Sequence, residues 1–452
     1  MRKRYNYRAY PTPVQRRALA RLFGCVRVVY NDTIADRQMV YETGLHLVEE
    51  PAPPRPDGKP RTRRSFTANR QTALITFAKD HHRPWLTQVA SGPLIQAIAD
   101  ADRAYRNFFD SAAGKRKGAK VGFPRFKTRH GGKHSAGFMF SRDALRLTVG
   151  ENDNATLRVP KVGDLRLAWS RDLPAPPSSV TITANPDGTY EVSFVVDAPA
   201  GDVEPDAGAP VMAGVDLGLA DYAIIARSDG TREKVPNPRH LRHAQRRLAR
   251  EQKALSRKQG PDRRTGQRPS HGWRRQAQVV ARQHAKVTAA RTDFQRKLAL
   301  RLARETQTVA VEKLNVHGLA RSGGSKAQGR GLRRSVHDAA WSAFVVRLRE
   351  KMGDRLIEVP AALTSQVCGV CGTLDGPKPL HVRTWTCHDC GALLDRDFNA
   401  AVNIGTAGLA ESGQHLADER VWRHQALVGA QAPTKPASVK HQPTGDRCEV
   451  TA

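Results

Sequence analysis

Four cysteines form two pairs, and within each pair two residues separate the cysteines. The pairs are Cys368/Cys371 and Cys387/Cys390, and a glycine follows each pair directly. Four thiolates at this spacing can surround one zinc ion tetrahedrally. A site whose four positions are all filled by cysteine leaves no position open for a substrate. The spacing therefore predicts a structural zinc ion in a short zinc ribbon.

Three acidic residues lie in segments that are otherwise apolar. Asp216 is in GVDLGL and Glu312 is in VAVEKL, which both read as strands, and Asp397 begins a helix in LLDRDFNAAVNIG. A carboxylate in an apolar strand is costly to bury without a neutralising partner. Together the three acids suit hard divalent cations that activate water for phosphodiester hydrolysis. Taken singly, each acid also fits an ordinary structural role: Asp216 as a strand-end residue, Glu312 as a solvated charge and Asp397 as a helix N-cap.

The elements that position these residues follow from the periodicity of the chain. In the first half, Thr12 and Gln15 form a capping box for a helix, and a second helix covers 94–108. Residues 135–200 are rich in strands, with a hairpin over 180–196 that turns at 185–188. A linker near residue 207 marks a domain boundary.

The second half alternates strands and helices. A hairpin is expected over 211–227, followed by long basic helices over 241–304 that are interrupted at 260–272. Further predicted elements are a strand at 307–314, a helix at 337–352, a strand at 356–359 and a helix from Asp397.

The charge of the chain indicates a polyanionic partner. Its 452 residues include 74 Lys and Arg against 43 Asp and Glu, a net charge of +31. Residues 1–130 hold 26 basic against 10 acidic residues, and residues 241–304 hold 19 against 3. This excess argues against an ordinary small-molecule enzyme and favours nucleic acid binding. Among the aromatic residues of the basic segments, we expect Phe123 and Phe126 to pack in the core.

The sequence contains no apolar stretch of membrane-spanning length and no signal-peptide core. We therefore expect a cytoplasmic protein that has no membrane partner and that associates with the bacterial nucleoid.

The order GVDLGL, VAVEKLNV, TSQVCGVCG, CHDCG and LDRDFNAAVNIG closely resembles the TnpB (OrfB) family of insertion-sequence proteins. The likeness covers about residues 1–408. It implies an RNA-guided DNA endonuclease in which Asp216, Glu312 and Asp397 are the three catalytic, Mg²⁺-binding acids of a split RuvC-like site. Cys368, Cys371, Cys387 and Cys390 match the family's zinc-binding insertion. The chain departs from the family pattern in the proline-rich segment 51–64, in Glu-Lys-Leu for Glu-Asp-Leu, and in the tail after 408.

The resemblance also implies an α+β multidomain fold. A wedge β-barrel (1–10 and 131–206) carries an inserted helical recognition domain (11–130). An RNase H-like RuvC domain (207–363 and 394–408) contains the basic helices (239–304) and the zinc ribbon (364–393). The tail, 409–452, is expected to be disordered.

The implied function is cleavage of double-stranded DNA at guide-complementary targets beside a short adjacent motif. The implied cofactors are two Mg²⁺ ions, one structural Zn²⁺ and a guide RNA with a structured scaffold, on a chain expected to be monomeric, with a dimer left open. A compact type V CRISPR effector with the same chemistry is one alternative. Others are an RNA-guided regulator that does not cleave and a transposase that acts without RNA.

Overall fold

The computed structural model divides the chain into two compact units. The first unit contains residues 1–199 and 243–290, and the second contains residues 200–242 and 291–452. Among the described residues, no helix is long and apolar enough to cross a membrane. The proline-rich segment 51–64 and residues 413–452 of the expected tail lie outside the described residues. The structure describes residues 1–43, 75, 78–116, 118–129, 132–140, 145–150, 153–262, 264–321, 326–361, 363–379 and 381–412.

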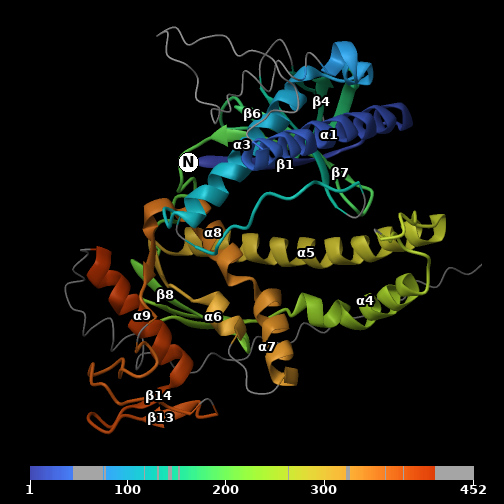
Figure 1. The fold of residues 1–452 in the computed structure, drawn as a ribbon. Helices are drawn as coiled ribbons and strands as arrows, with labels where there is room; N and C mark the ends of the chain where they lie inside the picture. Colours follow the sequence, from blue (N-terminus) through green and yellow to red (C-terminus); the bar gives the residue numbers. More distant parts are fainter. Residues whose placement is uncertain are drawn as a thin grey trace, which may run out of the picture. The chain divides into compact units, whose positions relative to one another are not determined.

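A seven-stranded antiparallel sheet dominates the first unit (Figure 1). Its order is β2-β6-β7-β1-β5-β4-β3, so the first strand of the chain lies at the centre. The expected hairpin is confirmed, because β6 and β7 pair across a turn in which Gly188 has a φ of 87°. The strands are β1 Arg2–Ala9, β2 His134–Met139, β3 Arg146–Val149, β4 Asn154–Val159, β5 Gly163–Ala168, β6 Ser179–Ala184 and β7 Tyr190–Asp197.

Two helices of the first unit, α1 (Pro13–Thr43) and α3 (Ser91–Ala112), pack against each other and against β2. The expected capping box is confirmed. The Thr12 N–H donates to Gln15 Oε1 at 2.9 Å, and the Gln15 N–H donates to Thr12 Oγ1 at 3.3 Å. A short 3-10 helix, η1 (Pro84–Gln88), precedes α3.

The aromatic side chains of the first unit are partly buried and partly exposed. Tyr7 is buried and stacks on Trp169, with ring centroids 4.3 Å apart. The expectation that Phe123 and Phe126 pack in the core is wrong, since they are 43% and 52% exposed. Both lie in a stretch that forms neither helix nor strand, so no regular face covers them. Phe123 still contacts the ring of Tyr105.

The second unit contains a five-stranded mixed sheet of order β10-β9-β8-β11-β12. The β8–β9 hairpin and β10 are antiparallel, whereas β11 and β12 run parallel to β8. The predicted strands at 211–227, 307–314 and 356–359 are thereby confirmed. The five strands are β8 Met212–Leu217, β9 Asp221–Arg227, β10 Arg232–Pro236, β11 Thr308–Glu312 and β12 Leu356–Val359.

The two long basic helices are confirmed as α4 (His240–Ser256) and α5 (His271–Glu305), and both contain residues of both units. The predicted helix at 337–352 is two helices, because Ala340 is left-handed with a φ of 50°. Gln295 stabilises this break by donating to the carbonyls of Ala339 and Ala340. The other helices here are α6 Val316–Arg321, α7 Lys326–Ala339, α8 Trp341–Met352 and η2 Gly353–Arg355.

The last helix, α9 (Arg396–Ser412), packs against β8, β9, β11 and β12. It follows a two-stranded sheet of β13 (Thr384–Thr386) and β14 (Leu393–Asp395). The helix continues four residues beyond the expected domain end at 408. Figure 1 shows α9 in red, with β13 and β14 beside its beginning.

Candidate functional site: three carboxylates and a cysteine centre

The parallel pairing of β8 with β11 makes Asp216 and Glu312 neighbours. The last pair in their register is Val215 with Val311, so the next residue on each strand is an acid. Both valines are buried in a core on one face of the sheet. Because side chains alternate along a strand, the two carboxyl groups lie on the opposite face. That is the face on which α9 packs, because Met212 and Ala310 on it contact the helix core.

Gly214 brings α9 unusually close to this face. A Cβ atom at Gly214 would overlap the carbonyl oxygen of Ala401 and lie 2.6 Å from the nitrogen of Gly405. One turn farther along the helix, a Cβ at Gly408 would lie 2.5 Å from that of Ala310. Helix and strand therefore meet backbone to backbone, which only glycine allows. This contact places the first turn of α9, with Asp397, beside Asp216.

The charges of Glu312 and Asp397 both act on Asp216. Burial, followed by the charges of Glu312 and Asp397, raises the pKa of Asp216 to about 7, against lowering by the Leu217 N–H and Arg396. Burial also raises the pKa of Glu312, although a hydrogen bond from the Thr364 hydroxyl opposes that rise. Like charges gathered in a buried place are destabilising until a cation joins them. Of the sequence-predicted acids, Glu312 and Asp397 thus both lie near enough to Asp216 for their charges to act on it.

Asp395 and Asp397 have different roles at the start of α9. Asp395 Oδ1 accepts the N–H groups of Asp397 and Phe398 at 2.9 and 3.1 Å, so its side chain caps the helix. Its other oxygen accepts from Lys234 at 2.8 Å. The Asp397 carboxyl instead accepts from Arg383 at 3.4 Å on both oxygens. The geometry separates the capping acid from the acid that faces Asp216.

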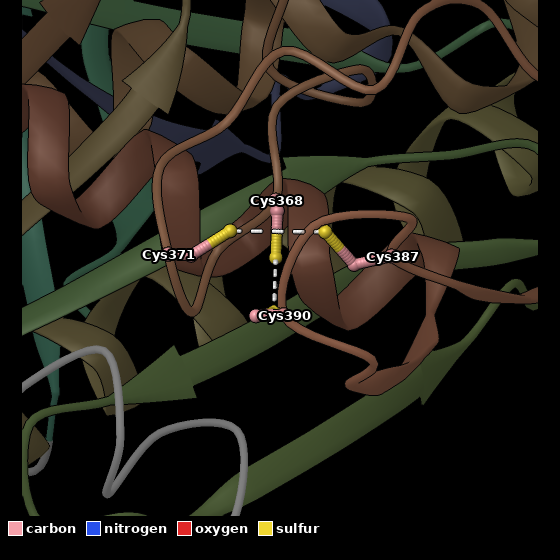
Figure 2. Close-up of side chains that lie close together, drawn as sticks. All are labelled: Cys368, Cys371, Cys387 and Cys390. Carbon is pink, nitrogen blue, oxygen red and sulfur yellow. Dashed lines mark hydrogen bonds between the residues drawn. The ribbon is translucent and has the colours of Figure 1, made fainter.

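The four cysteine side chains point toward one centre (Figure 2). The Cys368 and Cys390 sulfurs are 3.8 Å apart, those of Cys371 and Cys387 are 3.7 Å apart, and all four lie within 4.8 Å. A tetrahedron with Zn–S bonds of about 2.3 Å has sulfurs about 3.8 Å apart. The donor set therefore fits a zinc ion.

The two halves of the cysteine centre repeat one hydrogen-bond pattern. The N–H of Cys368 donates to Thr373 O and that of Cys387 to Ala392 O, each five residues on. The N–H groups of Gly372 and Gly391 donate back to the first cysteine of each pair. Both glycines have positive φ, 82° and 70°, so each knuckle closes in a conformation that glycine favours.

The pKa values of the thiols in this cluster differ from one cysteine to another. Burial raises the pKa of Cys368 to about 12 and also raises that of Cys387. Burial acts in the same direction on Cys371, but hydrogen bonds from Thr373 and the neighbouring thiols lower its pKa to about 7. Four thiolates cannot coexist so close together without a cation, and metal binding would release their protons. Among the described residues, these four cysteines form the group of three or more candidate metal ligands whose donor atoms all lie within 4.8 Å of one another.

Sequence reasoning missed two polar residues that join α9 to the cysteine region. Asn399 is fully buried; its Oδ1 accepts the N–H of Gly369 at 2.7 Å, and its Nδ2 donates to Val367 O at 2.8 Å. Asn403 donates to the carbonyls of Thr364 and Val367, both at 2.8 Å. The signal available was the i, i+4 spacing of two asparagines on the buried side of a helix.

Three family models match the chain. The OrfB_IS605 model, described as a "Probable transposase", matches residues 191–323 and so includes Asp216 and Glu312. A helix-turn-helix model of the same name matches residues 1–46. A model described as the Cas12f1-like TNB domain matches residues 341–404, which include Asp397 and the four cysteines.

Two relatives match this chain over nearly their whole length. "Putative RNA-guided DNA endonuclease" of Streptomyces pristinaespiralis is 34% identical over 418 residues, 91% of this chain and 90% of the relative. "Putative RNA-guided DNA endonuclease InsQ" of Escherichia coli K12 is 28% identical over 447 residues, 94% and 98% of the two chains. Among solved structures, a Cas12f1–sgRNA–target DNA complex covers 90% of this chain and 98% of its own at 13% identity. Its TM-score of 0.46 does not establish a shared fold.

Proposed function

The chain belongs to the TnpB (OrfB) family of insertion-sequence proteins, and from this premise we propose that it is a transposon-associated, RNA-guided DNA endonuclease. It hydrolyses phosphodiester bonds of double-stranded DNA at sites complementary to its guide and adjacent to a short motif. The observation that carries this proposal is the environment of Asp216, where burial and then the charges of Glu312 and Asp397 raise its pKa to about 7.

The sheet of the second unit supports an RNase H-like RuvC domain. The sheet has three antiparallel strands, β10, β9 and β8, beside two strands that run parallel to β8, and an acid lies near the end of β8 and of β11. This arrangement suits such a site. We assign residues 207–363 and 394–408 to this domain and 364–393 to a zinc ribbon. Residues 1–10 and 131–206 form the wedge domain, and 11–130 the recognition domain.

Asp216, Glu312 and Asp397 would hold Mg²⁺, since carboxylate oxygens are the ligands that this hard cation prefers. Bound ions would supply activation of water and stabilisation of the leaving oxygen. The protein's own part is to hold three half-buried acids near one another, so that the charges of Glu312 and Asp397 on Asp216 favour cation binding, and to fix them by the β8–β11 register and the Gly214 contact. We also assign Cys368, Cys371, Cys387 and Cys390 to a structural Zn²⁺.

The partners of this function are a guide RNA with a structured scaffold and a DNA duplex. The net charge of +31 supports them, because neutralising phosphates is what a surplus of Lys and Arg does. A positively charged channel would hold the guide–target heteroduplex by its backbone and A-form shape. We place one monomer of the protein on each guide RNA.

The test is to express the gene with its native flanking DNA, purify the protein and sequence the RNA that accompanies it. The expected result is one discrete structured RNA with a variable end. Replacing that end should direct Mg²⁺-dependent cleavage of a matching plasmid. Heterogeneous cellular RNA alone would contradict RNA guidance. Guided binding without cleavage would identify a regulator, and an RNA from a CRISPR array would identify a type V effector.

A further inference from the structure

Glu312 is held from outside its own strand by a residue of the cysteine region. The hydroxyl of Thr364 donates to Glu312 Oε1, in a short contact between half-buried side chains. Thr364 lies four residues before Cys368, in the segment that leads into the first knuckle. Glu312 is at the end of β11, where a carboxylate has several accessible rotamers unless something fixes it. The hydroxyl selects one of them.

Thr364 is in turn held by α9. Asn403 Nδ2 donates to the Thr364 carbonyl and to that of Val367, both at 2.8 Å. One turn earlier in the helix, Asn399 bonds Val367 O and the N–H of Gly369. Each amide makes two hydrogen bonds to this segment, both of them from Nδ2 in Asn403, and breaking such buried bonds is costly. The segment 364–369 is therefore bound to α9, the helix whose first turn contains Asp397.

We propose that Thr364 and Asn403 are positioning residues for the nuclease site: Asn403 fixes the Thr364 backbone, and the Thr364 hydroxyl orients the Glu312 carboxylate toward the cation. This inference rests on the function proposed above. It gives the segment before the first knuckle a part in metal binding at the carboxylates, in addition to any part in zinc binding. Residues that orient a metal ligand in this way commonly change metal affinity or activity by about 10- to 100-fold.

The test uses Thr364→Val, which keeps the size of the side chain but removes its hydroxyl, and Thr364→Ser, which restores the hydroxyl. In the guide RNA complex, Thr364→Val should raise the Mg²⁺ concentration for half-maximal plasmid cleavage by about tenfold. Thr364→Ser should return that concentration toward the wild-type value. Asn403→Ala should shift it in the same direction as Thr364→Val.

A second readout reports occupancy of the site without cleavage of DNA. Fe²⁺, which also accepts oxygen ligands, can replace Mg²⁺ and, with ascorbate and peroxide, cuts the polypeptide near its binding site. Such cuts near 216, 312 and 397 should need about tenfold more Fe²⁺ in Thr364→Val. Zinc content and thermal stability should stay close to wild type.

The matched control is Thr406→Val, which removes a hydroxyl that donates to Val402 O within α9 itself. It should leave both metal dependences unchanged. Should Thr364→Val cleave with wild-type Mg²⁺ and Fe²⁺ dependence, the positioning role is wrong although the nuclease assignment stands. A shift of the same size in Thr406→Val, or no rescue by Thr364→Ser, would also overturn it. A wild-type protein that does not cleave would instead count against the proposed function.

Discussion

The Asp216 carboxyl lies at the end of a strand that is otherwise apolar, with two further acids close by. Burial and those two charges raise its pKa to about 7, so the metal-free site holds a proton more readily than an ordinary aspartate does. A divalent cation reverses this situation, because it favours the charged form of each ligand. At the scale of single residues, the ionised site therefore destabilises the folded protein when no cation is bound.

Asp216→Asn should abolish guided cleavage while leaving RNA and target binding close to wild type. The amide has nearly the same size but binds a hard cation poorly. Plasmid cleavage and gel-shift assays measure the two properties separately. Asp229→Asn is the control, since Asp229 accepts the Thr231 N–H in the turn after β9 and lies away from the acids. Lost binding in Asp216→Asn would make the acid structural.

The same substitution should stabilise the metal-free protein at alkaline pH. The pKa of Asp216 is raised in the folded protein, so its charge opposes folding. That cost is absent below the unfolded value of about 3.8 and complete above about 7. Asp216→Asn should therefore melt at a higher temperature than wild type at pH 8 in EDTA, and the difference should shrink at pH 5. Adding Mg²⁺ should stabilise wild type alone. An equal difference at both pH values would contradict the buried charge.

At the scale of elements, the strands and helices around the site could be predicted because their apolar periodicity is local. Their contacts could not. Gly214 reads in the sequence as one small residue in a strand, and its reason is visible only once α9, almost two hundred residues later, lies against it. The break at Ala340 was missed for a similar cause, since Gln295 on another helix satisfies the carbonyls there.

Gly214→Ala should detach α9 from the sheet, since the new methyl group meets helix backbone that cannot move aside. We expect a loss of about 3 kcal/mol or more in the free energy of unfolding, together with loss of cleavage. Gly331→Ala, at an exposed position of α7 with open space around it, should be neutral or stabilise by up to about 1 kcal/mol. Denaturant unfolding measures both. Similar stabilities for the two variants would refute the close contact.

Cys368→Ser should remove zinc from the purified protein and lower the melting temperature of the second unit. Its thiolate is one of the four expected zinc ligands, and because Cys368 is fully buried, a water molecule cannot take the place of the missing thiolate. The zinc content measured by elemental analysis should fall from one zinc ion per chain to a small fraction of that. Cys25→Ala is the control, because Cys25 is a buried residue of α1 outside the cluster. Unchanged zinc in Cys368→Ser would contradict the four-cysteine site.

At the scale of the whole molecule, the sequence directly establishes the net charge of the chain. It does not specify the path that a bound nucleic acid follows over the protein. The acids were recognised as a set through resemblance, since each one alone fits a commonplace role. What the structure adds is the register and the close helix contact that make them a set physically. The amides of Asn399 and Asn403 and the hydroxyl of Thr364 could be recognised as contacts only once the fold was known.

Binding of guide RNA should weaken steeply with salt. A chain with a net charge of +31 that neutralises six to ten phosphates should lose about 10³-fold or more in affinity between about 50 and 200 mM salt. Fluorescence anisotropy with labelled guide RNA, repeated at several KCl concentrations, gives the slope. A nearly flat dependence would show that the basic residues serve another partner.

The backbone contact at Gly214 has a consequence for how the protein is made. The three acids span residues 216 to 397, and α9 is the last described element to leave the ribosome. Until then the sheet has an open face and the third acid does not exist. A growing or prematurely terminated chain therefore carries its basic segments, and can meet nucleic acid, without the means to cut it. The order of synthesis therefore completes the basic segments before the set of three acids.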